Sequence, residues 1–344
     1  MSDQPRIPHT GSLLEKHLTP ELFEKLKSRK TVNGFTLYDA IRSGRENPDS
    51  SVGIYAGDAE TYQVFPEIFN PMINEYHRFS NDRRHVSDLS PAALEDPDPE
   101  NRYIVSTRVR AARNLEGFAF TPFISLSARR KVERLFLHAL SGHPVLENSR
   151  YISYGDLSKN DFQKLCRKFP MFGKGDRFQE SAGINRDFPE ARGVFLSSDL
   201  KLVIWLHEED HLRIISMEEG SNLSGVFNRL ADILSFLETG IAFAKDSRYG
   251  YLSACPSNIG TAMRAGVHIR LPMLDRQREK LYRTAEQAGL QVRGTGGEKT
   301  DVRDSVFDIS NKKRLGITET DCIQTLYHGV RNLIRMEKEL SSFL

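Results

Sequence analysis

Three consecutive carboxylates, Glu208, Glu209 and Asp210, lie between two histidines in the segment from Trp205 to Arg213. Short apolar runs rich in β-branched residues flank them, which predicts that the acids occupy the joint between two strands. Acids this close repel one another, so a fold tolerates them most easily where cations or Mg²⁺ arrive. The alternative from the segment alone is a solvated acidic turn.

The same segment matches the pattern H-E-x-x-H through His207 and His211. A zinc protease needs those two histidines one turn apart on a helix. The flanks favour strand, and in an extended chain the two side chains would be ~13 Å apart. The sequence therefore disfavours a zinc site here.

Two arginines share one side of a predicted strand over residues 103–110. The period of two places Arg108 and Arg110 beside Ser106, and turns Tyr103, Val105, Thr107 and Val109 toward the core. Cations on one sheet face repel each other unless an anion lies there. A solvated face is the alternative.

A further reactive group is Cys255, which precedes a turn that also presents Ser257. The serine hydroxyl and nearby cations are expected to lower the pKa of this thiol. An inert buried cysteine is the more common case.

The elements that must position these residues fall into two regions. Residues 1–90 are predicted to be helical, with caps at Thr19 and Thr36 and a stop at Gly44. Residues 91–101, with several prolines and acids, are predicted as a linker, and strands alternate with helices over 102–344. A helix over 127–141 is expected to turn Val132, Leu135, Phe136 and Ala139 inward.

Composition limits the class of protein. The chain has 344 residues, of which 39% are hydrophobic and 27% charged, enough for two domains with their own cores. With 48 Lys and Arg against 46 Asp and Glu, nothing suggests a nucleic-acid or membrane partner. Three widely spaced cysteines, and a start without a signal-peptide pattern, predict free thiols and a cytoplasmic location.

Six motifs in fixed order resemble those of the phosphagen (guanidino) kinase family. They are STRVR at 106–110, EEDHLRIISM at 208–217, CPSNIGT at 255–261, VRGTGG at 292–297, DISN at 308–311 and MEKE at 336–339. The resemblance covers essentially the whole chain. It implies an α+β protein, with a small all-α N-terminal domain followed by a larger domain built on an antiparallel β-sheet flanked by helices.

The resemblance assigns roles to the chemical groups. Those implied to bind ATP are Arg108, Arg110, Arg213, Arg264, Arg293, His268 and Asp308. Glu208 and Asp210 would hold Mg²⁺ through water. Glu209 and Glu298 would grip the substrate guanidinium, one of them taking its proton, with the Cys255 thiolate against the same group. The glycine-led loop from Gly294 would close over the site.

The resemblance also indicates the acceptor. The substrate loop, comprising Ser50, Ser51, Val52, Gly53 and Tyr55, is similar to that of arginine kinases, as are Tyr76 and Glu298. L-arginine is therefore the expected acceptor, with ATP and ADP as the nucleotides. Kinases for taurocyamine, glycocyamine, lombricine or creatine are the alternatives.

Two other classes are disfavoured. A bacterial-type protein-arginine kinase would lack the N-terminal helical domain, and an inactive relative would lack part of the charged set. Three positions depart from the family pattern: His207 replaces an asparagine, Phe169 a histidine near the nucleotide, and Ser51 a glycine.

Assembly is expected to follow the dimeric members of the family. The sequence at 128–135 resembles their interface helix, which predicts a two-fold homodimer in which Arg130 or Arg134 pairs with Asp187 and Phe188 is buried. A monomer with these charges solvated is the alternative.

Overall fold

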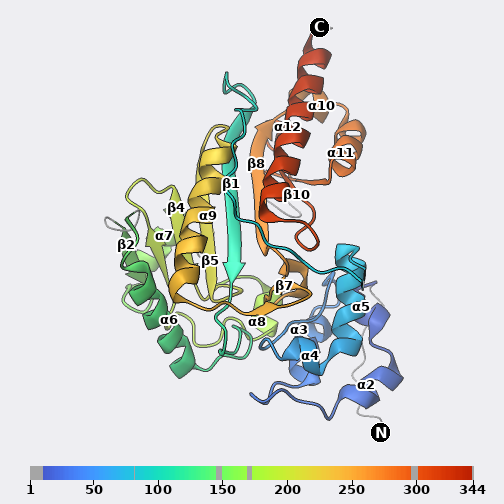
Figure 1. Ribbon diagram of the computed structural model, residues 1–344, viewed down its shortest axis with the longest axis vertical. Helices are drawn as coiled ribbons and strands as arrows, with labels where there is room; N and C mark the ends of the chain where they lie inside the picture. Colours follow the sequence, from blue (N-terminus) through green and yellow to red (C-terminus); the bar gives the residue numbers. More distant parts are fainter. Residues whose placement is uncertain (1–10, 81, 145–148, 169–172, 296–300, 343–344) are drawn as a thin grey trace.

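The computed structural model describes residues 11–80, 82–144, 149–168, 173–295 and 301–342. A helical N-terminal region lies beside a larger region built on an antiparallel sheet with helices packed on it (Figure 1). This arrangement confirms the predicted fold class.

The N-terminal region is helical because its capping residues start helices where the sequence predicts. The helices are α1 (Leu13–His17), α2 (Pro20–Leu26), α3 (Leu37–Glu46), α4 (Thr61–Val64) and α5 (Pro66–His77). Thr19 caps α2, and Thr36 with Asp39 forms a reciprocal capping box on α3. The predicted stop at Gly44 is wrong, because α3 continues to Glu46.

Within the described residues, eight antiparallel strands form the main sheet. In spatial order they are β2 (Arg150–Ser153), β3 (Gly193–Leu196), β4 (Leu202–Leu206), β5 (Leu212–Glu219), β1 (Ile104–Arg113), β8 (Met263–Arg270), β10 (Val306–Asn311) and β9 (Leu290–Arg293). A separate pair joins β6 (Lys245–Asp246) to β7 (Gly250–Tyr251). Strand β1 occupies the middle of the sheet, so residues on its two neighbours converge around it.

One expectation for β1 is wrong. Val105 is 47% exposed, whereas Thr107 and Val109 are buried as predicted. The pairing of β1 with β8 shifts register between Ile104 and Ser106, so Ile104 takes the buried position in place of Val105.

Helices α9 (Leu223–Gly240) and α12 (Glu319–Ser341) lie against one face of the sheet, and α6 (Leu126–Leu140) packs on α9 (Figure 1). The remaining helices are α7 (Lys159–Lys168), α8 (Arg177–Ser181), α10 (Pro272–Asp275), α11 (Arg278–Gln287) and the 3₁₀ turn η3 (Pro256–Asn258). In α6, Val132 and Phe136 are buried as predicted. Leu135 is 40% exposed and Ala139 only half-buried, so the apolar stripe is narrower than expected.

The N-terminal region and the larger region share one apolar cluster, while a second cluster lies between the sheet and its helices. One apolar cluster joins Phe65 and Phe69 of the N-terminal helices to Leu252, Ala254 and Cys255 of the larger region. The connection between them runs from the end of α5 at His77 to the start of β1 at Ile104. The buried carboxylate of Glu319 holds this connection through Ser87 and the main chain of Asp88.

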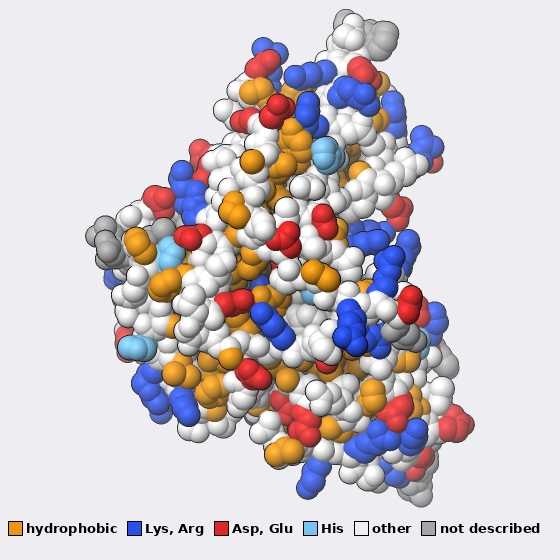
Figure 2. All heavy atoms as spheres, in the orientation of Figure 1, with side chains coloured by type: hydrophobic (Ala, Val, Ile, Leu, Met, Phe, Trp, Pro, Cys, Tyr) orange, Lys and Arg blue, Asp and Glu red, His pale blue; other side chains and the backbone are white. Residues whose placement is uncertain are grey.

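Acidic and basic side chains are interspersed over the face shown in Figure 2, in keeping with the near-zero net charge. Among the described residues, no helix combines the length and apolar character needed to cross a membrane. The three cysteines are free thiols, as predicted.

Candidate active site

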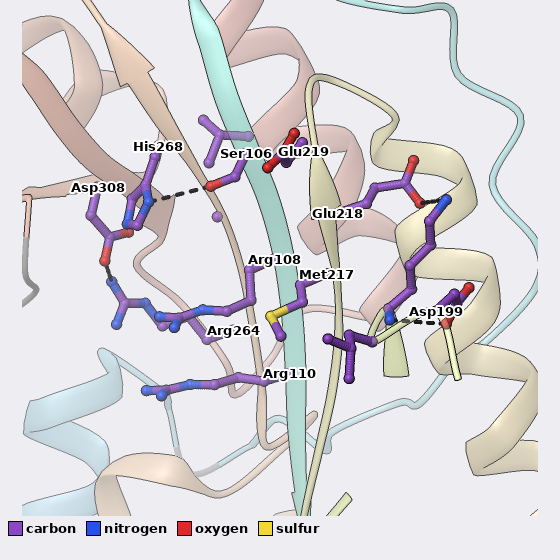
Figure 3. Close-up of a pocket in the computed structure, with 14 residues that line it drawn as sticks. Ser106, Arg108, Arg110, Asp199, Met217, Glu218, Glu219, Arg264, His268 and Asp308 are labelled. Atoms are coloured by element: carbon purple, nitrogen blue, oxygen red, sulfur yellow. Dashed lines mark hydrogen bonds and ion pairs between the residues drawn. The ribbon is translucent and has the colours of Figure 1, made fainter. Parts of the chain in front are cut away.

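Register across the sheet gathers the predicted nucleotide-binding residues. One row of paired residues crosses five strands and consists of Glu219, Ser106, His268, Asp308 and Arg293. The next row contains Met217, Arg108 and Gly266, and the one after it pairs Arg110 with Arg264. Apart from Arg293, these residues line a cleft of about 580 Å³ (Figure 3).

Two arginines of this cleft are cations without counter-charges in contact. Among the described residues, the guanidinium groups of Arg108 and Arg110 form no hydrogen bond or ion pair. Burial, together with Arg213 and Arg108, lowers the pKa of Arg110 well below its ordinary value. Two half-buried guanidinium groups this close repel each other unless an anion lies between them, so this end of the cleft is suited to bind an anion.

The other predicted arginines surround the same place. Arg264 donates to Asp308 at 2.8 Å and to Ser310 at 3.0 Å, which fixes its orientation (Figure 3). Arg213 lines a small cavity together with Arg110 and Arg264. Arg293 of β9 lies opposite Asp308 of β10 in the register of the two strands. All five predicted arginines are therefore brought together.

The acidic segment forms the turn between β4 and β5, as its flanks predict. Glu208 binds Arg213 at 2.7 Å and accepts from Gln179 at 3.0 Å. The Glu209 side chain is only 14% exposed and lies 3.7 Å from Arg213. Burial, followed by the charges of Glu208 and Asp210, raises the pKa of Glu209. A carboxylate with a raised pKa is suited to accept a proton near neutral pH.

Asp210 is held differently from the other two acids. Its carboxylate accepts from Asn114 at 2.6 Å, from Ser253 at 2.6 Å and from the Ala254 amide at 2.7 Å. Both oxygens are thus engaged, and Asp210 ties the acidic turn to the segment that precedes Cys255. Burial raises the pKa of Asp210 in spite of these donors.

The separation predicted for His207 and His211 in an extended chain is wrong, because the turn folds back on itself. His207 has a φ of 54° and donates its amide to His211 O, so the two rings are 5.4 Å apart. Both ring nitrogens of His211 are engaged, Nδ1 by the Leu115 amide and Nε2 by Ala119 O. His207 Nε2 contacts Arg129 O. These histidines brace the turn.

Cys255 is the N-cap residue that precedes η3, and its Sγ lies 3.0 Å from Ser257 Oγ. Burial and the Glu209 carboxylate raise the pKa of this thiol to about 12, although Ser257 acts in the opposite direction. The expected lowering of the Cys255 pKa is therefore wrong for the surroundings that this structure shows. A guanidinium cation beside the sulfur would favour the thiolate.

The N-terminal region fixes the main chain on both sides of Cys255. Ala56 donates to Ala254 O at 2.7 Å, and the Tyr62 hydroxyl donates to Ser253 O at 2.7 Å. The His77 ring is 2.8 Å from Pro256 O. The position of the thiol thus depends on helices far away in the sequence.

The predicted substrate loop lies next to this segment. Ser51 O and Val52 O accept from α1, Gly53 N donates to Ser50 Oγ, and Tyr55 N donates to Ala40 O. Burial, followed by the charge of Glu209, raises the pKa of Tyr55 well above its usual range. Tyr76 lies on α5, 46% exposed, with its ring against His77.

Some predicted residues lie outside the described ones. They are Glu298, the loop glycines 296 and 297, and Phe169.

Two residues at the acidic turn were missed from the sequence. Asn258 Nδ2 donates to Glu209 Oε2 at 3.0 Å. Arg314 Nη1 donates to Asn258 Oδ1 at 3.0 Å and to Ser257 O at 2.8 Å. Because Arg314 occupies the amide oxygen, the Asn258 NH₂ group must face Glu209. Asn258 lies within the motif at 255–261, whereas no sequence signal marks Arg314.

Both regions of the chain match a known protein family. Residues 8–74 match the family described as ATP:guanido phosphotransferase, N-terminal domain, and residues 131–340 match its C-terminal catalytic domain. The arginine kinase Lit v 2 of Penaeus vannamei is 42% identical over 96% of this chain and 93% of its own length. An arginine kinase of Anthopleura japonica is also 42% identical over 96% of this chain, which spans about half (47%) of that protein.

Solved structures share the fold. A lombricine kinase superimposes with a TM-score of 0.91 at 34% identity, covering 98% of this chain and 95% of its own. The duplicated taurocyamine kinase of Schistosoma mansoni gives a TM-score of 0.89 at 34% identity, covering 96% of this chain and 47% of its own.

Proposed function

The chain belongs to the ATP:guanido phosphotransferase family, the phosphagen kinases, and we propose that it transfers the γ-phosphoryl group of ATP reversibly to L-arginine. The products would be phosphoarginine and ADP, so that the reaction buffers ATP. The observation that carries this proposal is the pair of half-buried arginines Arg108 and Arg110, which form no hydrogen bond or ion pair among the described residues. Arg110 is near enough for its charge to oppose the rise in the pKa of Glu209.

The arginines would act on the phosphates by position and charge. Phosphoryl transfer needs little covalent help from protein, so the rate depends on alignment and on cations around the transferring group. Guanidinium groups stay charged and match phosphate oxygens in a bidentate way. Arg264, fixed by Asp308 and Ser310, is already oriented before nucleotide arrives.

The acids would bind and deprotonate the acceptor. The guanidinium must lose one proton as its nitrogen bonds to phosphorus. Glu209 would take this proton, because its raised pKa lets the carboxylate exchange a proton near neutral pH. We propose Glu298 as its partner from the other side and Cys255 as a group that orients the guanidinium.

Mg²⁺ would enter with ATP. Its preferred ligands are oxygens, and it keeps several waters. Among the described residues, no group of three or more His, Cys, Asp and Glu side chains is placed to hold a metal directly. Water-mediated contact therefore suits this site better than a protein cage. Glu208 and Asp210 are the proposed ligands, and each would first have to release a donor: Arg213 or Gln179 in the case of Glu208, and one of three in the case of Asp210.

Arginine as acceptor is supported by the curated relatives at 42% identity and by the substrate loop beside Cys255. The loop residues Ser50, Ser51, Val52, Gly53 and Tyr55, with Tyr76, are proposed to set the size of the acceptor. Lombricine and taurocyamine are the competing acceptors, because kinases named for them share this fold.

A coupled assay of ADP release with a panel of guanidines tests this proposal. L-arginine should give the highest kcat/KM, above taurocyamine, lombricine, glycocyamine and creatine. A higher value for another guanidine would refute the acceptor, and ADP release with none of them would refute phosphoryl transfer itself.

A further inference from the structure

Leu200 stands at the nucleotide cleft in a conformation that leucine rarely adopts. It lies in the turn between β3 and β4 with a φ of 58°, in the left-handed region that favours glycine or asparagine. The residue is 36% exposed and belongs to none of the three apolar clusters. Neither backbone preference nor core packing accounts for a leucine here.

The turn is held firmly in place. Leu200 N donates to Ser197 O at 2.9 Å, and Asp199 Oδ1 accepts from both Ser197 Oγ and the Lys201 amide. The turn is also joined to β5, because Met217 N donates to Lys201 O at 2.9 Å. Leu200 therefore has a defined place at the β5 side of the cleft.

The lining of the cleft is mostly charged or polar. Of the described residues that line it, only Leu200, Met217 and Val267 carry apolar side chains larger than alanine. Val267 is 1% exposed and belongs to the core on the helix-covered face, so Leu200 and Met217 supply the apolar side-chain surface. Met217 lies between Arg108 and Asp199 in Figure 3.

A glycine lines the cleft between these groups. Gly266 pairs with Arg108 across β1 and has no side chain to fill the cleft. A triphosphate held by Arg108, Arg110 and Arg264 leaves the nucleoside to the remaining part of the cleft. A nucleobase has two apolar faces, and ligand pockets cover such faces with apolar side chains.

We propose that Leu200 is a specificity residue that covers the base of the bound purine nucleotide, with Met217 beside it. The proposal rests on the proposed phosphoryl transfer from ATP and adds a determinant for its nucleoside. Leu200 contacts the base and leaves the phosphates to the arginines. Removal of the Leu200 side chain therefore weakens the binding of ATP but not the binding of a ligand that has phosphates alone.

Two substitutions and a matched control test this. Leu200→Asn and Leu200→Gly both suit a positive φ, so the turn keeps its shape. Leu135→Asn serves as control, because Leu135 has a similar exposure, 40%, on α6. Binding of ATP and of inorganic tripolyphosphate is measured by calorimetry for each protein, with the KM for ATP at saturating acceptor.

Both Leu200 variants should bind ATP roughly tenfold more weakly, since an apolar side chain is lost from the base. Tripolyphosphate affinity should match that of the unmodified protein and of Leu135→Asn, and the melting temperature should not fall, because Asn and Gly tolerate the positive φ better than Leu. Unchanged ATP affinity would overturn the proposal, as would equal losses for ATP and tripolyphosphate. An unmodified protein that binds neither ligand would instead refute the proposed function, and this inference with it.

Discussion

At the scale of single residues, the charge on Glu209 is set by opposing neighbours. Burial, Glu208 and Asp210 favour its protonated form, whereas Arg213, Arg110 and the Asn258 amide favour the carboxylate. Asn258 presents its NH₂ group because Arg314 occupies the other side of the amide. This balance keeps a buried acid able to exchange a proton.

Glu209→Gln should lower kcat by at least about 100-fold while changing ATP affinity little. The substitution removes the proton acceptor and one charge from the guanidinium clamp, but leaves the arginines around the phosphates in place. Steady-state kinetics and direct ATP binding measure the two effects. A collapse of ATP affinity would show that acids and arginines do not divide the work in this way.

Asn258→Ala should move the acidic limb of the kcat/KM profile to higher pH by about one unit. The amide stabilises the charged carboxylate, so its loss raises the pKa of Glu209 further, and more base is protonated at a given pH. Kinetics between pH 5 and 9 measure the shift.

Asn228→Ala is the matched control, because among the described residues that side-chain amide bonds to the main chain of Ala92 alone. It should leave the limb in place. An unmoved limb in Asn258→Ala would mean that Asn258 does not act on the proton acceptor.

At the scale of elements, the substrate loop depends on its close approach to α3. A Cβ on Gly44 would lie 2.4 Å from Gly53 O, and Gly53 itself has a φ of 80°. Two glycines thus allow the loop to pass directly over the helix. The amide of Ala56, just beyond the loop, then reaches Ala254 O beside Cys255.

Gly44→Ala should displace the loop, raise the KM for arginine at least several-fold and lower the free energy of unfolding by about 1–3 kcal/mol. The KM for ATP should change little, since the arginines lie elsewhere. Gly240→Ala at the end of α9 is the control, because a Cβ there meets nothing within 4 Å. Equal effects on both KM values would argue against a separate role for this loop.

At the scale of the whole molecule, the shared apolar cluster makes the helical region part of the active site. Tyr62 and His77 reach across it to the main chain around Cys255. That residues 91–101 are a linker between two separately folding domains stays a prediction.

The proposed homodimer needs a revised interface. Phe188 packs within its own chain against Tyr154 and Phe162, and Arg130 binds Glu190 at 2.9 Å. Asp187 is exposed and remains able to meet Arg134 of a second copy.

We expect a two-fold dimer at micromolar concentration, which Asp187→Ala with Arg134→Ala should convert to monomer. Each exposed pair contributes less than ~1 kcal/mol, but two-fold symmetry repeats it. Light scattering measures the mass. The control is the double variant Asp161→Ala, Lys164→Ala, which removes an exposed ion pair on α7. A mass of 39.2 kDa for the unmodified protein would contradict the dimer.

The sequence by itself determined those features that depend on local spacing. The caps at Thr19 and Thr36, the strands flanking the acidic turn and the shared face of Arg108 and Arg110 follow from periods of two and from side chains that bond within four residues. The motifs also indicated the family, because their order in the chain is visible without a structure.

Only the tertiary structure decided the features that depend on distant residues. The turn at His207 brings two histidines together, the register shift exposes Val105, and burial raises the pKa of Cys255. Asn258 and Arg314 act on Glu209 through contacts between segments far apart in the chain. Spacing along a sequence cannot reveal such contacts, since they are set by how strands pair and which surfaces are buried.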